Sequence, residues 1–394
     1  MRDLSLKLAL TAMALSATVA TGWAQDAGAA AERFKKLLAA QGVELGWESL
    51  SGGGSDFVLK NVSVVPAGQQ DKLNIGDVTF SDVEEADGGV SVGEISTQAH
   101  TIEKDGATIA ISPFVLTGVH LPADGNTDPV ASVLFYKQAD LESVNVKMGD
   151  KQVFDMQKLH IDVTPPTADA PMGFTGSADS FTADLSTVGD PNAKAVLEAL
   201  GYQTLSGDFE MAGTWQPADG RMALTQYDLN VNDAGSFGFT FDIGGYTPSF
   251  IKSLQDMQKQ MAAQPAGADQ SAAGLAILGL MQQLTFNTAS IRYDDDSLTG
   301  KLLEYYGKQQ GISAKDLANQ IKALVPFGMA QLNNPELTAS VSTAVNKFLD
   351  DPKSLEITAQ PASAVPFALI MAGAMATPQD LPKTLGVTVA ANED

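Results

Sequence analysis

The sequence contains no cysteine, only three histidines and few charged residues. Without cysteine there are no disulfides, thiolate metal sites or cysteine nucleophiles, so a stable fold must rest on an apolar core. Charged residues make up 18% of the chain, against about 25% in an average protein, whereas 44% of the residues are hydrophobic. A chain of 394 residues with this composition can bury a large core without covalent cross-links.

Basic residues are also scarce. The chain has 24 Lys and Arg against 47 Asp and Glu, which gives a net charge of −23 at pH 7. An acidic surface of this kind repels phosphate backbones and anionic headgroups, and no basic stripe with interleaved aromatic residues occurs. We therefore expect no nucleic-acid partner.

Apolar runs of membrane-spanning length, about 20 residues, are missing too. The run from Leu8 to Thr21 is shorter, follows Arg2 and Lys7, and closes on the small residues of a signal-peptidase site. The pattern predicts a signal peptide over 1–24, cleavage after Ala24, export to the periplasm and no transmembrane segment afterwards. An uncleaved anchor is the alternative. Two other apolar segments, 272–284 and 362–376, are also too short to span and predict buried helices.

The remaining chain divides into three parts. Residues 25–42 predict an N-terminal helix with Phe34, Leu37 and Leu38 on one face. Residues 43–245 are short runs of β-branched and aromatic residues broken by turn residues, which predicts an antiparallel β-rich domain. Residues 246–394 predict a mixed helical and strand part that is either separate or continuous with the sheet. The predicted fold class is α+β, with a long curved antiparallel sheet.

One phrase recurs in the β-rich part: Phe57-Val58-Leu59-Lys60-Asn61-Val62-Ser63-Val64 returns as Phe114-Val115-Leu116-Thr117-Gly118-Val119-His120-Leu121. Strict alternation would put its first and last apolar residues on opposite faces. An extra residue near Lys60-Asn61 would bring all four to one face and bend the strand, so the phrase predicts a β-bulge. A strand end followed by a turn is the alternative interpretation.

Ser249-Phe250-Ile251-Lys252 has the spacing of a serine nucleophile with a lysine one helical turn away. The partner motifs of such hydrolases are missing, because Lys383-Thr384 is followed by Leu385 instead of glycine. Ser249 and Lys252 therefore remain an alternative, and we expect no catalytic residue and no enzymatic activity.

Two acidic clusters suggest calcium but fail the spacing of a calcium loop. Asp294-Asp295-Asp296 is followed by Thr299 and Tyr305 where glycine and glutamate are required. The segment Asp124-Gly125-Asn126-Thr127-Asp128 fails in the same way. We expect the first cluster to place carboxylates at the N-terminus of the following helix.

The three histidines, His100, His120 and His160, each stand alone in a predicted strand. A zinc site would need them to converge with a carboxylate, since no cysteine is available. The sequence also lacks a phosphate-binding glycine loop and a serine-histidine-aspartate signature. We therefore expect no cofactor and no metal, and the ligand-binding residues stay unknown at this point.

The two related strand phrases resemble those of AsmA-like and related uncharacterised bacterial periplasmic proteins. The stretch from Ile291-Arg292-Tyr293 through Tyr305-Tyr306 to Gln309-Gln310-Gly311 is similar in style. The resemblance implies a long curved sheet and a role in envelope lipid homeostasis, and it brings no catalytic residues. The chain departs from those proteins in its cleavable signal peptide, which argues against a membrane-tethered bridge.

The functional hypothesis is a non-enzymatic periplasmic envelope protein that binds an apolar or lipid-like ligand against the inner face of its sheet. Two alternatives remain: a serine hydrolase using Ser249 and Lys252, and a structural protein that binds an envelope protein partner.

Overall fold

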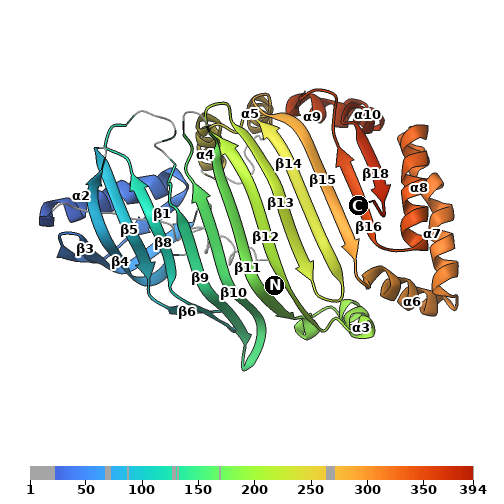
Figure 1. Ribbon diagram of the computed structural model, residues 1–394, viewed down its shortest axis with the longest axis horizontal. Coiled ribbons are helices and arrows are strands. Elements are labelled where there is room, and N and C mark those ends of the chain that lie inside the picture. Colours follow the sequence, from blue (N-terminus) through green and yellow to red (C-terminus); the bar gives the residue numbers. More distant parts are fainter. Residues whose placement is uncertain are drawn as a thin grey trace.

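A computed structural model describes residues 23–66, 72–86, 88–126, 130, 133–167, 170–262 and 271–393. Within them, the strands form one open, curved antiparallel sheet with helices gathered around its ends (Figure 1). The predicted fold class is confirmed. The strands are β1 (Val43–Gly46), β2 (Ser49–Gly53), β3 (Asp56–Pro66), β4 (Leu73–Ala86), β5 (Gly89–Thr97), β6 (His100–Lys104), β7 (Ala107–Ile111), β8 (Phe114–Leu121), β9 (Gln138–Met148), β10 (Lys151–Thr164), β11 (Met172–Asp184), β12 (Thr204–Gln216), β13 (Arg221–Val231), β14 (Gly235–Gly244), β15 (Thr285–Asp295), β16 (Ser354–Ala359), β17 (Val365–Pro366) and β18 (Val387–Ala391).

The helices stand before, between and after these strands. They are α2 (Trp23–Ala40), α3 (Pro191–Leu200), α4 (Pro248–Ala262), α5 (Ser271–Met281), α6 (Leu298–Gln310), α7 (Ala314–Met329), α8 (Pro335–Asp350), α9 (Phe367–Ala376) and α10 (Leu381–Thr384), with 3-10 turns η2 (Leu185–Thr187), η3 (Ala330–Leu332) and η4 (Pro378–Asp380). The signal peptide predicted over 1–24 lies outside the described residues except for its last two, which begin α2.

Neighbouring strands in the sheet mostly follow one another in sequence. β1 and β2 pair with successive lengths of β3, and the order continues through β4, β5, β8 and β9. The β6–β7 hairpin joins β9 beside β8. From β9 the sheet runs without interruption through β10 to β16 and ends at β18. The strands of the C-terminal part therefore continue the same sheet.

The predicted bulge is confirmed in the first copy of the phrase. In the second copy a left-handed glycine stands at the same position, but β8 keeps its pairing register with β5. Asn61 and Gly118 take left-handed backbone conformations, with φ of 51° and 63°, and the pairing register shifts beside Asn61. Glycine and asparagine adopt this conformation at little cost, which is why they stand there. Eight of the ten apolar side chains of the two phrases consequently reach the buried face: Phe57, Leu59, Val62, Val64, Phe114, Leu116, Val119 and Leu121.

The main core lies where the sheet curls around α2. Phe34 of α2 is fully buried and meets the ring of Phe80 on β4 edge to face, at 6.4 Å between centroids. Phe80 in turn stacks on Phe57 of β3. The residue pattern of 25–42 thus predicted the helix and its buried face correctly, and α2 closes the concave side of β1–β9 (Figure 1).

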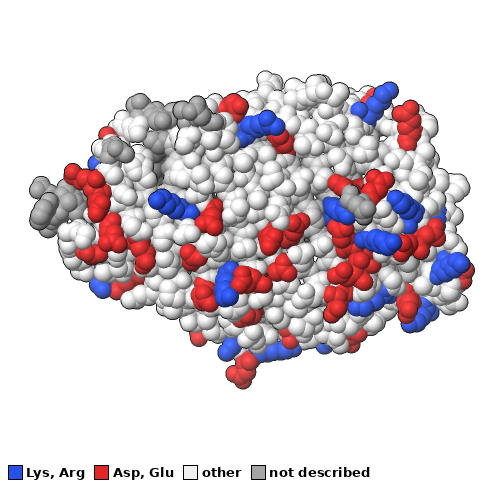
Figure 2. All heavy atoms as spheres, viewed as in Figure 1, with Lys and Arg blue, Asp and Glu red and all other residues white. Residues whose placement is uncertain are grey.

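Beyond β9 the sheet is a single layer with two chemically different faces. One face carries Leu141, Leu159 and Ala178, which are paired across β9, β10 and β11, and we call it the apolar face. The opposite face, the polar face, carries Asp140, His160 and Ser177 in the same rows of pairs. Acidic and basic side chains are spread over the polar face (Figure 2).

Two helices differ from their predicted environment. The segments 272–284 and 362–376 were expected to form buried helices, but α9 has no buried residue. The first segment is buried in part, because Leu280 and Leu284 pack against Phe250 whereas Leu275 is 71% exposed. The apolar composition predicted helices too short to span a bilayer, yet composition alone does not determine what covers a helix. No helix in the described part of the chain is long and apolar enough to cross a membrane.

Candidate apolar binding site

The apolar face between β11 and β16 forms a continuous floor of aromatic and aliphatic side chains. Phe237, Ile291 and Ile357 on this floor are 41%, 44% and 46% exposed, although each is flanked by other apolar residues. The floor residues are Phe174, Phe181, Phe209, Met211, Leu224, Tyr227, Leu229, Phe237, Phe239, Phe241, Ala289, Ile291 and Ile357. None of them belongs to the hydrophobic clusters that the described helices form with the sheet.

Glycines opposite large side chains keep this floor flat. Phe174 is paired with Gly213, and Phe181 with Gly207, across β11 and β12. A Cβ atom at either glycine would collide with the paired ring, so the rings lie over the glycine backbone. Phe209 and Tyr227 meet edge to face at 5.0 Å between centroids. The arrangement produces a broad apolar surface close to the sheet backbone.

Helices at both ends of the strands form walls around the floor. At one end, Phe367 of α9 meets Phe286 of β15 edge to face at 6.4 Å, and Phe250 of α4 is buried in the same cluster. At the other end, Leu205 of β12 and Val231 of β13 pack with α3 and α6. These contacts use apolar-face side chains, so the helices stand on that side of the sheet.

The remaining two sides are also closed. α2 fills the curl of β1–β9 at one edge of the floor. At the opposite edge, Phe348 of α8 meets Tyr293 edge to face at 6.3 Å and clusters with Leu355, Val389 and Ala391. The floor therefore lies at the bottom of a trough with walls on four sides.

The floor is long enough for an acyl chain. From β11 to β16 there are five intervals between strands, and at about 4.8 Å each they span about 24 Å. The hydrocarbon of one membrane leaflet is about 15 Å thick, half of the bilayer core. An extended acyl chain therefore fits across the strands within the walls.

On the polar face, His160 lies between two carboxylates. Its Nδ1 is 2.6 Å from Asp140 Oδ1 and its Nε2 is 2.8 Å from Asp162 Oδ2. Both ring nitrogens face acceptors, and these bonds, that of Asp140 first, raise the pKa of His160. The imidazolium has no free nitrogen for a metal or for proton transfer, so this histidine links β9 to β10. An open depression of about 320 Å³ beside it is lined by charged and polar residues, among them the ion pair Lys158–Asp179.

A second cross-strand link on the polar face joins β13, β14 and β15. Arg221 Nη2 donates to Asp242 Oδ2 at 2.6 Å, and Asn287 Nδ2 donates to Asp242 Oδ1 at 2.8 Å. Burial of Asp242 would raise its pKa, but the hydrogen bonds from Arg221 and Asn287 outweigh burial and lower it. The carboxylate is therefore ionised and fully engaged.

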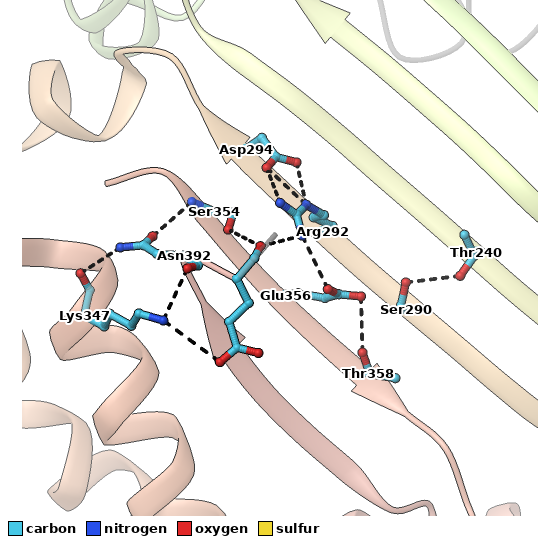
Figure 3. Close-up of polar contacts among 10 residues, drawn as sticks. Thr240, Ser290, Arg292, Asp294, Lys347, Ser354, Glu356, Thr358 and Asn392 are labelled. Carbon is cyan, nitrogen blue, oxygen red and sulfur yellow. Dashed lines mark hydrogen bonds and ion pairs between the residues drawn. The ribbon is translucent and has the colours of Figure 1, made fainter. Parts of the chain in front are cut away.

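A third polar network holds the C-terminal strands (Figure 3). Arg292 makes a bidentate contact with Asp294 and reaches the Glu393 carbonyl at 3.2 Å. Asn392 donates to the carbonyls of Lys347 and Asp351, and accepts from the Ser354 backbone amide. These bonds tie β18 to α8 and β16, which positions the wall at that edge of the trough.

The serine-lysine pair does not form a catalytic unit in this structure. Lys252 Nζ donates to Asp256 Oδ2 at 2.6 Å, one turn further along α4, and its side chain is 74% exposed. Ser249 lies exposed in the first turn of α4.

The acidic clusters make hydrogen bonds and ion pairs at helix α6 and helix α2, and the histidines lie on separate strands. Asp295 Oδ1 accepts from the Thr299 amide at 2.7 Å, which confirms the predicted carboxylate at the start of α6. Asp124 pairs with Arg33 and Lys36 of α2, while Thr127 and Asp128 of that cluster lie outside the described residues. His100, His120 and His160 stay apart on β6, β8 and β10. Among the residues that the structure describes, no group of His, Asp and Glu is placed to hold a metal ion.

Comparison with known proteins adds one finding. A family model described as an uncharacterized protein matches residues 228–392. The matched segment begins within β13 and includes the C-terminal part of the sheet. No curated protein matches the sequence.

Sequence reasoning identified part of the floor without assigning it a role. The sequence shows that Phe237, Phe239 and Phe241 alternate with small or polar residues, which places the three rings on one face of a strand. The exposure of these side chains could not be read from the pattern, because an apolar strand face looks the same whether or not another layer covers it. The cross-strand pairing of Phe174 with Gly213 was equally invisible, since it depends on register.

Proposed function

We propose that this chain is a non-enzymatic periplasmic envelope protein that binds an acyl chain in the trough over β11–β16. The observation that carries the proposal is the apolar floor, which lies outside the clusters of the described helices and on which Phe237, Ile291 and Ile357 are each more than two-fifths exposed. Exposed apolar surfaces of this extent in water mark sites of ligand or partner binding. The predicted signal peptide supports the periplasmic location.

An acyl chain suits the trough better than a polar ligand does. The floor offers rings and aliphatic groups, and the charged networks of Asp242 and Arg292 stand on the opposite face. Burying a methylene group contributes about 0.8 kcal/mol, so about ten methylenes gain several kcal/mol even when only one side of the chain is covered. Such a ligand needs no specific polar contact with the floor.

The proposal is tested by binding of cis-parinaric acid, a fluorescent fatty acid, to the delipidated protein. We expect saturable binding that Phe237→Asp weakens at least tenfold, which corresponds to about 1.4 kcal/mol. Because Phe237 is 41% exposed, its replacement leaves no large cavity.

Ser236→Asp is the matched control. It adds the same charge one residue away, on the polar face, because Ser236 pairs with Asp294 whereas Phe237 pairs with Tyr293. We expect Ser236→Asp to bind the probe like the unmodified protein. Equal loss in both variants, or no saturable binding at all, would contradict an acyl site on the floor.

A further inference from the structure

The end of the trough next to α5 and α9 carries a group of strongly exposed apolar side chains. We call this group the apolar apex. Met375 is 86% exposed, Phe327 76% and Leu275 71%. The apex consists of Leu275 and Leu278 on α5, Leu324 and Phe327 on α7, and Leu369 and Met375 on α9.

These three helices meet at one place in the fold. α5 contacts α9 directly, and the turn η3 that ends α7 contacts η4, which follows α9. α5 and α9 stand together at the same end of the strands (Figure 1). The apex is therefore assembled from segments far apart in the sequence, with η3 and η4 between α9 and the end of α7.

The apex is also free of charge. The segments 270–291, 323–335 and 357–379 contain no Asp, Glu, Lys or Arg, in a chain in which 18% of residues are charged. The outline of the molecule above α5 and α9 is accordingly white in Figure 2, while charges are spread over the face below. The protein has a net charge of −23, so the rest of its surface is repelled by anionic headgroups.

The chemistry of α5 and α9 matches a bilayer better than a protein partner. Protein interfaces concentrate their binding energy in Trp, Tyr and Arg and surround it with hydrogen-bonding groups. α5 (SAAGLAILGLM) and α9 (FALIMAGAMA) contain none of these three residues, and Ser271 is their only polar side chain. A helix that is apolar on all sides belongs in a core or in lipid, and these two are only partly covered by the protein.

We propose that the apolar apex inserts shallowly into the surface of a neutral lipid bilayer. α5 and α9 have 11 and 10 residues, too few to cross the hydrocarbon but enough to lie in its outer layer. Phe367, the first residue of α9, packs on Phe286 at the end of β15, so the apex adjoins the trough. If the floor binds acyl chains as proposed above, a chain can pass from the bilayer to the floor without crossing charged surface. The docking itself does not depend on that site.

Vesicle flotation tests the docking. The exported protein is mixed with phosphatidylcholine vesicles, and we expect it to float with them at low and at high salt, because an apolar contact is not screened. The double variant Leu275→Asp with Met375→Asp should reduce the bound fraction at least tenfold. Both side chains are too exposed for these changes to open a core.

Two controls separate this proposal from the ligand site. Met148→Asp changes another exposed methionine, 43% exposed at the β9–β10 turn, and should leave flotation unchanged. Phe237→Asp should lose cis-parinaric acid but still float, whereas the apex double variant should bind the fatty acid and fail to float.

Three results would overturn the docking proposal: absence of flotation of the unmodified protein, flotation of the double variant at the normal level, and flotation that salt abolishes. Sedimentation velocity identifies the rival occupant. A dimer that the double variant dissociates, without any vesicle binding, would assign the apex to contact between two copies of this chain.

Discussion

At the scale of single residues, the polar face is maintained by cross-strand ion pairs of which His160 is the most sensitive to pH. Its contacts with Asp140 and Asp162 raise its pKa in the folded protein above the unfolded value of about 6.5. The contribution of the pair to stability is therefore complete below pH 6.5 or so and is lost as the pH rises through the folded pKa.

The expected result is that His160→Gln destabilises the protein more at pH 5.5 than at pH 8.5. The side chain is 37% exposed, so solvent screening holds the difference below about 1 kcal/mol. Urea denaturation of both proteins at the two pH values measures it. A difference that is larger at pH 8.5 would show that His160 is held as the neutral imidazole, contrary to the geometry.

At the scale of elements, a left-handed residue in each copy of the recurring phrase brings its apolar side chains to one face of the sheet. Gly118 has φ of 63°, and a side chain there would meet Lys137 as well as the strain of the left-handed conformation. We expect Gly118→Val to lower the free energy of unfolding by about 2 kcal/mol, since a left-handed conformation costs an ordinary residue about 1–2 kcal/mol and a β-branched one more. Thr117→Val, one residue earlier in β8, should change it by less than about 0.5 kcal/mol. Thermal or urea unfolding compares the two variants. Similar losses of unfolding free energy would mean that the left-handed conformation of Gly118 is not what makes a side chain there unfavourable.

The same phrase shows how much of the fold the sequence predicts. Phe57, Leu59, Val62 and Val64 break strict alternation, and a bulge is the local device that returns them to one face, so a local pattern was sufficient. The same is true of α3, where Asp190 accepts from the Asn192 and Ala193 amides and Gly201 ends the helix. These features depend only on neighbouring residues.

The features that define the site depend on distant residues and were not predictable in this way. The joining of β15 to β14 relates residues 285–295 to 235–244, and nothing local specifies it. The apolar composition of α5 and α9 predicted burial, which is wrong for α9 and holds only for one side of α5, because composition does not show how much of a helix the rest of the chain covers. The trough is thus visible only after the sheet and its walls are assembled.

At the scale of the whole molecule, the two halves of the sheet are stabilised differently. The curl of β1–β9 encloses α2 in a large continuous core, whereas the described helices pack in small clusters around the edges of β11–β16 and leave the floor open. The second half therefore lacks the burial that the first half has. A ligand on the floor would supply apolar contacts that the described helices do not provide there.

This difference predicts where an acyl ligand stabilises the protein. A ligand at 100 times its Kd raises the free energy of unfolding by about 2.7 kcal/mol, and local opening of β11–β14 should be suppressed more than that of β3–β5. Hydrogen exchange of the delipidated protein, with and without palmitate, measures this. We expect slower exchange in β11–β14 on addition of palmitate, little change in β3–β5, and no change in Phe237→Asp. The polar face carries the ion pair Arg221–Asp242 across β13 and β14 and the ion pair Arg292–Asp294 within β15, and a ligand on the opposite face touches neither. Protection that spread equally over both halves would therefore place the ligand elsewhere, against the α2 core and not in the trough.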